Sequence, residues 1–369
     1  MPKLLYFVTV DSYFCSHRLP LAIAAQRDGY EVVVVTQVGE MGQRIREAGL
    51  KLIHLPCSRR SVNPFRELRL LARLIAIYRC ERPDVVHHVA IKPVLYGSIA
   101  ARLAGVRATV NAVTGLGYIF SSQSLLARAL RPFVTAAFRR LLRRGRLIVQ
   151  NHDDAAHFQR LGIGNQVVIR GSGVDPDVYR PGDGDNSHIV VLASRMLWDK
   201  GVGEFVEAAG LLRREGYEWR FVLVGSPDAQ NRASISEAQL HEWSAAGLVE
   251  WWGHRTDMSA LLAGAAVACL PSYREGLPKS LIEAAACALP VVTTDVPGCR
   301  EIVRHGENGL LVPVRDAAAL ADALRELFDD AGMRRRMGRQ GRARVEDSFS
   351  EQEVVRATLS IYKDALSES

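Results

Sequence analysis

The sequence lacks several features that would mark a membrane-spanning or secreted protein. No apolar run reaches the length of a membrane span, and the N-terminal MPKLLYFVTV is typical of a strand rather than of a cleavable signal peptide. The six cysteines include no C-x-x-C pair, and most lie in apolar segments, which indicates core thiols in a reducing compartment. We therefore expect a cytoplasmic protein, although not necessarily one far from a membrane.

The sequence also lacks the motifs typical of binding a dinucleotide cofactor, a metal ion or a nucleic acid. The turn after the first strand has no G-x-G-x-x-G fingerprint, which speaks against a dinucleotide cofactor there. No D-x-D-type cluster of metal ligands lies near the candidate site described below, and no aromatic stacking pattern or nucleic-acid-binding motif accompanies the basic residues. We expect no cofactor, no metal and no nucleic-acid partner.

The positive charge is unevenly distributed. Residues 1–185 carry 26 Lys and Arg against 14 Asp and Glu, a net of +12, whereas residues 186–369 carry 21 against 26, a net of −5. The densest basic stretch, 125–146, has seven arginines, no acid and apolar residues at near-helical spacing. Such a helix either binds an anionic lipid surface or packs on a sheet with a solvated basic rim. We expect the basic N-terminal half to contact an anionic membrane surface.

Strand-like apolar runs alternate with helix-like segments along the chain. Residues 3–9 and 31–36 are separated by one helical segment, and this strand–helix–strand order predicts a parallel sheet. The polar, glycine-containing stretch 181–187 is typical of a linker, and strand 188–193 begins a second series. A chain of 369 residues fits two such α/β domains.

The most informative stretch is 271–301. A short apolar strand ends at its start, a loop containing Glu275 follows, and residues 279–288 are strong helix formers. A helix start of this kind directs backbone N–H groups at whatever occupies the loop and favours anions. Glu283 lies inside the helix among apolar residues, where a carboxylate costs free energy unless it is paired or faces a ligand. A helix-start acid and a solvated face are the plain alternatives for the two glutamates.

In the context EGLPKSLIEA, Glu275 and Glu283 resemble the E-x7-E signature of retaining glycosyltransferases of family 4, which have the GT-B fold. The following PVVTTDVPGCREIV and GENGLLVP strengthen a resemblance that covers essentially the whole chain. The resemblance is greatest to bacterial enzymes that transfer N-acetylgalactosamine to diacetylbacillosaminyl-diphosphoundecaprenol. The segments that carry it are SRRSVNPF, SRMLWDKGVGEF and PSYREGLPKSLIEA.

The resemblance implies two Rossmann-like parallel-sheet domains that face each other across a cleft. Residues 1–180 would bind the acceptor, and residues 181–350 would bind the nucleotide sugar. The amphipathic segment 351–369 would cross back onto the first domain.

The resemblance also implies a donor site in the second domain. Arg195 and Lys200 match the R-x4-K pair that clamps the donor diphosphate, and two cations suit a leaving group of about two negative charges. Solvated loop cations are the alternative. With Glu275 these are the expected catalytic residues. Glu283 would bind the ribose, and Glu275 would hold the sugar hydroxyls. The other expected donor-binding residues are Gly276, Leu277, Pro278, Arg255 in the turn that lines the base pocket, and Gly225 at the end of strand 219–226.

The expected acceptor site lies in the first domain, at the carboxyl ends of its strands. Strand 84–89 delivers His87 and His88, followed by Lys92, which could meet anionic groups or could be a plain helix-start lysine. The family's glycine-rich first loop is replaced here, and a histidine common in the family is missing near Thr114. The other expected acceptor or cleft residues are Ser16, His17 and Arg18 in the first loop, and Thr114 with Gly115, whose backbone a ligand can approach closely. A surface histidine at a helix start is the alternative for His17.

These features predict transfer of a sugar, plausibly an N-acetylhexosamine, from a UDP-sugar to a polyprenyl-diphosphate-linked saccharide. No paired carboxylates at glycosidase-like positions are visible, so we expect retention by front-face substitution without a metal. A UDP-sugar 2-epimerase of the same fold is the alternative enzyme. A non-catalytic, lipid-carrier-binding peripheral membrane protein is the alternative from another class.

Overall fold

The computed structural model describes residues 1–57, 63–115, 125–143, 145–182, 187–229 and 231–368, with 125–131 and 133 described by their backbone alone. Contacts within the chain define two compact units. Unit 1 is Met1–Ser172 with Gln352–Ser369, and unit 2 is Gly173–Glu351. The division falls after Ser172 rather than after residue 180, and the roles expected for the two domains stay predictions. Among the described residues, no helix is both long and apolar enough to cross a membrane.

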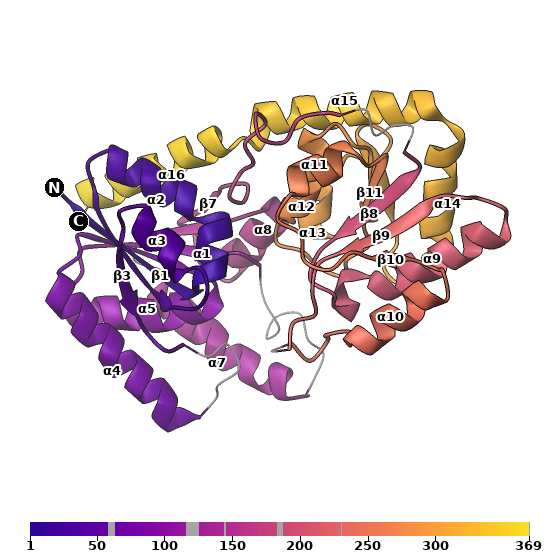
Figure 1. Cartoon of the computed structure of the whole chain (residues 1–369). Helices are drawn as coiled ribbons and strands as arrows, with labels where there is room; N and C mark the ends of the chain where they lie inside the picture. Colours follow the sequence, from indigo (N-terminus) through magenta and orange to yellow (C-terminus); the bar gives the residue numbers. More distant parts are fainter. Residues whose placement is uncertain (58–62, 116–124, 144, 183–186, 230, 369) are drawn as a thin grey trace. The chain divides into compact units, whose positions relative to one another are not determined.

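Unit 1 is built on a seven-stranded sheet in the order β3-β2-β1-β4-β5-β6-β7, in which every pair of neighbours is parallel (Figure 1). Most of its strands are almost continuously apolar because helices cover both faces. The strands are β1 Lys3–Val10, β2 Glu31–Gln37, β3 Lys51–His54, β4 Val85–Val89, β5 Ala108–Val113, β6 Arg146–Val149 and β7 Gln166–Val168.

The helices of unit 1 pack on the two faces of this sheet. One face holds α1 Asp11–His17, α2 Leu19–Arg27, α3 Gly42–Glu47 and the C-terminal α16 Glu351–Ser367. The other holds α4 Pro64–Glu81, α5 Ile91–Ala104, α7 Leu125–Leu141 and α8 His152–Arg160. The sequence predicted an open loop around Ser16 and His17, but these residues form the last turn of α1, and Arg18 joins α1 to α2.

A buried chain of polar groups fixes α16 to the sheet. The Tyr362 hydroxyl lies 2.6 Å from His87 Nδ1 and 3.0 Å from the Tyr6 hydroxyl. On the opposite face, His88 Nδ1 lies 2.8 Å from Asn111 Oδ1. Burial lowers the pKa of both imidazoles, that of His88 to about 4. The expectation that β4 presents these histidines at the ligand edge is therefore wrong, because both rings lie inside the cores.

Unit 2 contains a six-stranded parallel sheet in the order β10-β9-β8-β11-β12-β13, the 3-2-1-4-5-6 order of Rossmann domains. The strands are β8 Ile189–Ala193, β9 Arg220–Val224, β10 Glu250–Trp251, β11 Val267–Leu270, β12 Val291–Thr294 and β13 Gly309–Val312. The helices are α9 Val202–Arg214, α10 Glu237–Ala245, α11 Met258–Ala263, α12 Lys279–Ala286, α13 Pro297–Ile302, α14 Ala317–Asp329 and α15 Ala331–Ser348. The expected pair of Rossmann-like α/β sheets is thus confirmed.

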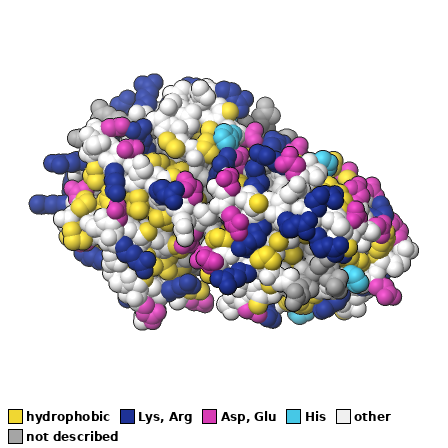
Figure 2. Space-filling model, turned by 90° about the horizontal axis from the view of Figure 1, so that it is seen from above, with side chains coloured by type: hydrophobic (Ala, Val, Ile, Leu, Met, Phe, Trp, Pro, Cys, Tyr) yellow, Lys and Arg dark blue, Asp and Glu magenta, His cyan; other side chains and the backbone are white. Residues whose placement is uncertain are grey.

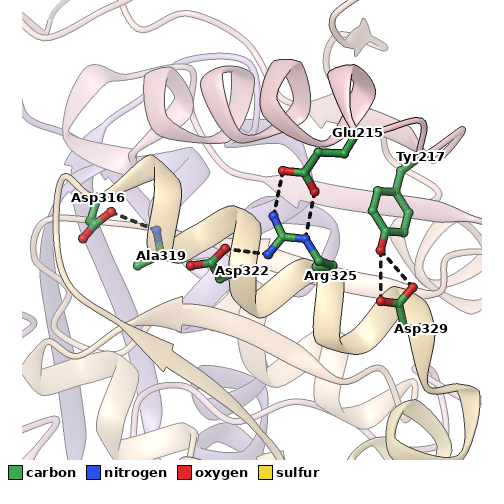
Figure 3. Close-up of polar contacts among 7 residues, drawn as sticks. All are labelled: Glu215, Tyr217, Asp316, Ala319, Asp322, Arg325 and Asp329. Atoms are coloured by element: carbon green, nitrogen blue, oxygen red, sulfur yellow. Dashed lines mark hydrogen bonds and ion pairs between the residues drawn. The ribbon is translucent and has the colours of Figure 1, made fainter.

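Polar side chains join the segment directly after α9 to α14 at the surface of unit 2 (Figure 3). Arg325 donates to both carboxylate oxygens of Glu215 at 2.8 Å, and the Tyr217 hydroxyl donates to Asp329 at 2.9 Å. Bidentate arginine–carboxylate pairs are geometrically specific, so they fix the register of the two helices more than they add stability.

We expect Tyr362→Phe to lower the free energy of unfolding by about 1–3 kcal/mol, because buried polar atoms of His87 and Tyr6 lose their partner. Chemical denaturation of the full chain followed by circular dichroism measures this. Tyr217→Phe is the matched control, since it removes a hydroxyl that is not enclosed, and its effect should be much smaller. Equal effects would contradict the role of the buried chain.

Candidate active site

The sheet of unit 2 has its topological switch point between β8 and β11, which are neighbours although β9 and β10 separate them in sequence. Ligands of open α/β sheets bind outside the carboxyl ends of the strands at such a point. The segment carrying Arg195 and Lys200 follows β8, and the loop carrying Glu275 follows β11. The fold therefore brings together two motifs that lie far apart in the sequence.

The two loops are held against each other through their backbones. The Tyr273 N–H donates to Asp199 O at 3.0 Å. Gly201 has φ +71°, and a Cβ there would lie 2.1 Å from Pro271 O, so only glycine fits. The Thr294 hydroxyl donates to Ser272 O from the end of β12. These contacts fix the relative position of the side chains that the loops carry.

Lys200 and Glu275 meet at this junction. The Lys200 ammonium contacts Glu275 Oε1, and the Ser272 hydroxyl donates to the same oxygen at 2.7 Å. The side chains are only 19% and 10% exposed, so water screens their attraction weakly. In this structure each residue thus neutralises the other.

Arg195 forms a second ion pair at the same edge of the sheet. Its Nη1 donates to Asp228 Oδ2 at 2.7 Å, and half of the arginine side chain is exposed. Gly225, at the end of β9, has φ +135°, and a Cβ there would lie 1.8 Å from Ser194 O, directly before the arginine. Gly225 therefore supports the backbone beside Arg195, and its expected contact with a donor stays a prediction.

Glu283 is almost enclosed in α12. Lys279 Nζ lies 3.7 Å from its carboxylate, and the Tyr179 hydroxyl is hydrogen-bonded to it. Burial raises the pKa of Glu283, and the neighbouring lysine and tyrosine oppose this rise. An enclosed carboxylate of this kind is suited to accept hydrogen bonds from ligand hydroxyls, as the ribose assignment requires.

Two residues of this site were missed by the sequence interpretation. Tyr179 lies before the first strand of unit 2, and Arg342 donates to its carbonyl at 3.0 Å, but no spacing pattern links Tyr179 to Glu283. Asp228 could have been noticed as an acid shortly after the end of β9, at the edge of the sheet where ligands bind.

The other expected donor residues lie around the same edge. Gly276, Leu277 and Pro278 precede α12, and Pro278 is the N-cap residue of this helix. Arg255 follows β10 and is paired with Asp257 at 2.6 and 2.8 Å on the surface. Its assignment to a base pocket stays a prediction.

In unit 1, the residues expected to meet the acceptor lie at the carboxyl ends of the strands. Ser16 Oγ lies 2.7 Å from His17 Nδ1, and the Tyr13 ring stacks on His17 at 4.2 Å between centroids. Arg18 is 4% exposed, and its Nη1 donates to His17 O at 3.3 Å. Among the three, Arg18 is therefore the residue least open to a ligand.

Lys92 lies in the first turn of α5, where its ammonium is 2.9 Å from Glu67 and 5.6 Å from the Tyr96 ring centre. Its charge is already matched inside unit 1. Thr114 and Gly115 are half-buried just after β5, and Gly115 has φ +127°, which suits close backbone approach. Their contact with an acceptor stays a prediction.

Two family models match the chain, one in each unit. A model described as glycosyl transferase 4-like matches residues 3–152, and one described as glycosyl transferases group 1 matches residues 187–330. The chain belongs to the GT4-like glycosyltransferases. The family expected from the E-x7-E motif is thus confirmed, and the chain is a transferase.

Relatives of this glycosyltransferase, and solved structures that are similar to it, support the same family assignment. It is 28% identical over 362 residues, 94% of each chain, to N,N'-diacetylbacillosaminyl-diphospho-undecaprenol alpha-1,3-N-acetylgalactosaminyltransferase of Campylobacter jejuni. It is 25% identical over 300 residues, 76% of each chain, to UDP-Gal:alpha-D-GlcNAc-diphosphoundecaprenol alpha-1,3-galactosyltransferase of Escherichia coli. Anabaena HepE in complex with UDP and glucose is similar with a TM-score of 0.81 and 18% identity, over 98% of this chain and 100% of that one. The expected GT-B fold is confirmed.

We expect Gly298→Ala to lower kcat/KM for glycosyl transfer about 100-fold, because small displacements of a catalytic group are costly. The new Cβ would lie 2.5 Å from Gly276 O and 2.8 Å from Glu275 O, so the loop must move. Steady-state kinetics measures this. Gly264→Ala, whose Cβ would meet its neighbours no closer than 3.5 Å, is the control and should keep wild-type kinetics.

We expect Glu283→Gln to stabilise the fold at neutral pH. A raised carboxyl pKa means that folding disfavours the ionised form, so the ionised group lowers stability above the folded-state pKa. The added stability of the variant should vanish as the pH falls through the folded-state pKa toward 4.5, the ordinary pKa of a glutamate. Thermal unfolding across this range measures it. Glu326→Gln, at an exposed position in α14, should show no such pH dependence.

Proposed function

We propose that this glycosyltransferase moves a sugar, an N-acetylhexosamine, from a UDP-sugar to a polyprenyl-diphosphate-linked saccharide during bacterial glycan assembly, with retention of anomeric configuration and without a metal. The observation that carries the proposal is the junction of Lys200 and Glu275 at the switch point of unit 2, beside Arg195. Two relatives named for transfer to diphosphoundecaprenol-linked sugars support the acceptor class. HepE, solved with UDP, supports the nucleotide.

The proposed donor complex exchanges one set of charge partners for another. The diphosphate takes Arg195 and Lys200, which in this structure contact Asp228 and Glu275. Glu275, freed from Lys200, then accepts hydrogen bonds from the sugar hydroxyls. The two cations stabilise the negative charge that develops on the diphosphate as the glycosidic bond breaks.

Retention is proposed to follow front-face substitution. The C1–O bond to the diphosphate breaks, and the acceptor oxygen forms a new bond to C1 on the same face. The acceptor proton passes to the leaving phosphate oxygen, so no protein nucleophile is required. The cations hold the leaving group close enough to receive that proton.

The proposed place of action is the cytoplasmic face of the bacterial inner membrane. A polyprenyl carrier keeps its tail in the lipid, so the enzyme must work at the surface. The basic charge of the first half of the chain supports attraction to anionic lipids.

Thermal shifts with UDP, GDP, ADP and NAD test the donor class, because a ligand at about 100 times its Kd adds roughly 2.7 kcal/mol of stability. UDP alone should stabilise the protein. UDP-N-acetylhexosamines incubated with a polyprenyl-diphosphate-linked sugar should then yield an α-linked product by NMR, with an unchanged rate in EDTA. Stabilisation by NAD, a β-linked product, or free epimerised UDP-sugar would each contradict the proposal.

We expect Lys200→Ala to lower kcat/KM about 100-fold or more, because it removes a charged contact to the leaving group in the transition state. Initial-rate kinetics with saturating acceptor measures this. Lys363→Ala, which removes an exposed lysine paired with Asp28 in unit 1, is the control for loss of one positive charge. Wild-type rates for Lys200→Ala would overturn the assignment.

A further inference from the structure

Helix α4 of unit 1 exposes large apolar side chains one turn apart. Phe65 is 82% exposed and Leu68 is 64% exposed, whereas Leu70, Leu74 and Tyr78 on the inner face are buried. The exposed apolar line continues at helical spacing through Ala72 and Ala76. A contiguous apolar strip of this kind on a soluble surface marks an interaction site.

The same outer face carries only positive charge. The arginines of this face are all exposed, and none of them forms an ion pair within the described part of the chain; they are Arg66, Arg69, Arg73 and Arg79. On the face drawn in Figure 2, by contrast, basic side chains are interspersed with acidic ones. The outer face of α4 is therefore both apolar and basic.

The two acids of α4 do not offset this charge, because both are turned inward. The Glu67 side chain is 12% exposed and paired with Lys92 of α5 at 2.9 Å. The Glu81 side chain is 9% exposed and paired with Lys51 at 2.8 Å and Lys3 at 3.3 Å. Each carboxylate is thus neutralised by a lysine from elsewhere in unit 1.

The exposed apolar residues lie at a defined end of the sheet. In a parallel sheet, a helix that follows a strand begins at the carboxyl edge, where ligands bind. Helix α4 follows β3 and begins at Pro64, with Asn63 Oδ1 accepting from Phe65 N at 3.1 Å. The Glu67–Lys92 pair joins its first turn to that of α5, beside which it lies (Figure 1).

We propose that the outer face of α4 is a membrane-docking surface, on which Phe65 and Leu68 enter the boundary between lipid headgroups and acyl chains while the arginines bind lipid phosphates. An interfacial helix combines these two features, an apolar strip and flanking arginines. A nucleic acid or an acidic protein would use the arginines but would leave the apolar strip in water. The dense basic stretch 125–146, which the sequence favoured for this role, overlaps α7, whose side chains are described only in part.

The surface gives a physical basis for meeting a lipid-linked acceptor. Docking through the first turns of α4 brings the carboxyl edge of the unit 1 sheet to the headgroup level, where the diphosphate of a polyprenyl carrier lies. This consequence rests on the proposed function, whereas membrane docking itself does not. The two can therefore be tested separately.

Co-sedimentation of the full chain with vesicles tests the docking. Wild type should bind vesicles of phosphatidylcholine and phosphatidylglycerol. Phe65→Ser with Leu68→Ser should weaken this binding about tenfold or more, because the free energy gained by burying either side chain corresponds to at least that change in affinity. Arg69→Gln with Arg73→Gln should weaken it at low salt and reduce its salt dependence. Val314→Ser, at a 42% exposed valine in unit 2, is the matched control and should bind as wild type does.

Failure of wild type to bind these vesicles, or unchanged binding by the Phe65 and Leu68 variant, would overturn the proposal. Equal loss of binding by Val314→Ser would also overturn it, because the effect would then reflect exposed apolar surface in general. Tighter binding to RNA than to vesicles, lost in the arginine variant alone, would assign the face to nucleic acid instead.

Activity separates this inference from the proposed function. The Phe65 and Leu68 variant should keep wild-type rates with a short-chain, water-soluble acceptor and lose about tenfold with a vesicle-embedded one. Equal loss with both acceptors would contradict docking through this face. If wild type transfers no sugar to either acceptor, the proposed function fails, and the vesicle-binding result still decides the docking surface.

Discussion

The candidate site of unit 2 depends on the close backbone contact between the loops that follow β8 and β11. Gly201 leaves room for Pro271 O, and the Tyr273 N–H bonds to Asp199 O, so the loops cannot separate without losing both contacts. This packing places Lys200 against Glu275, although 75 residues separate them in the chain. Orientation is thus established by folding, before any ligand arrives, and a ligand does not have to supply that free energy.

In the proposed donor site, the carboxylates paired with the two cations would make binding selective. Arg195 is matched by Asp228, and Lys200 is matched by Glu275. Under the proposed function, an incoming anion would have to displace the carboxylates that already pair with Arg195 and Lys200. A single phosphate would displace one carboxylate, whereas a sugar diphosphate would displace both and also offer hydroxyls to the released Glu275. This competition favours a ligand that presents all three features together.

The sequence predicted the parts of the fold that follow from local patterns. Apolar runs alternating with helical segments predicted both parallel sheets, and the family resemblance pointed to Lys200 and Glu275, which the structure brings into contact. Contacts between distant segments had no such pattern. Tyr179 reaches Glu283, and Tyr362 encloses His87, only because tertiary packing brings them together. The same packing turned the two β4 histidines into core residues, and it extended α1 through a stretch expected to be a loop.

The return of α16 to unit 1 determines the order in which the chain can be completed during synthesis. Unit 2 is continuous in sequence, from Gly173 to Glu351, whereas unit 1 needs a segment, Gln352–Ser369, that follows all of unit 2 in the sequence. Until Tyr362 arrives, the imidazole of His87 and the hydroxyl of Tyr6 lack their shared partner in the sheet. The second unit can therefore finish folding before the first, the reverse of the usual N-to-C order.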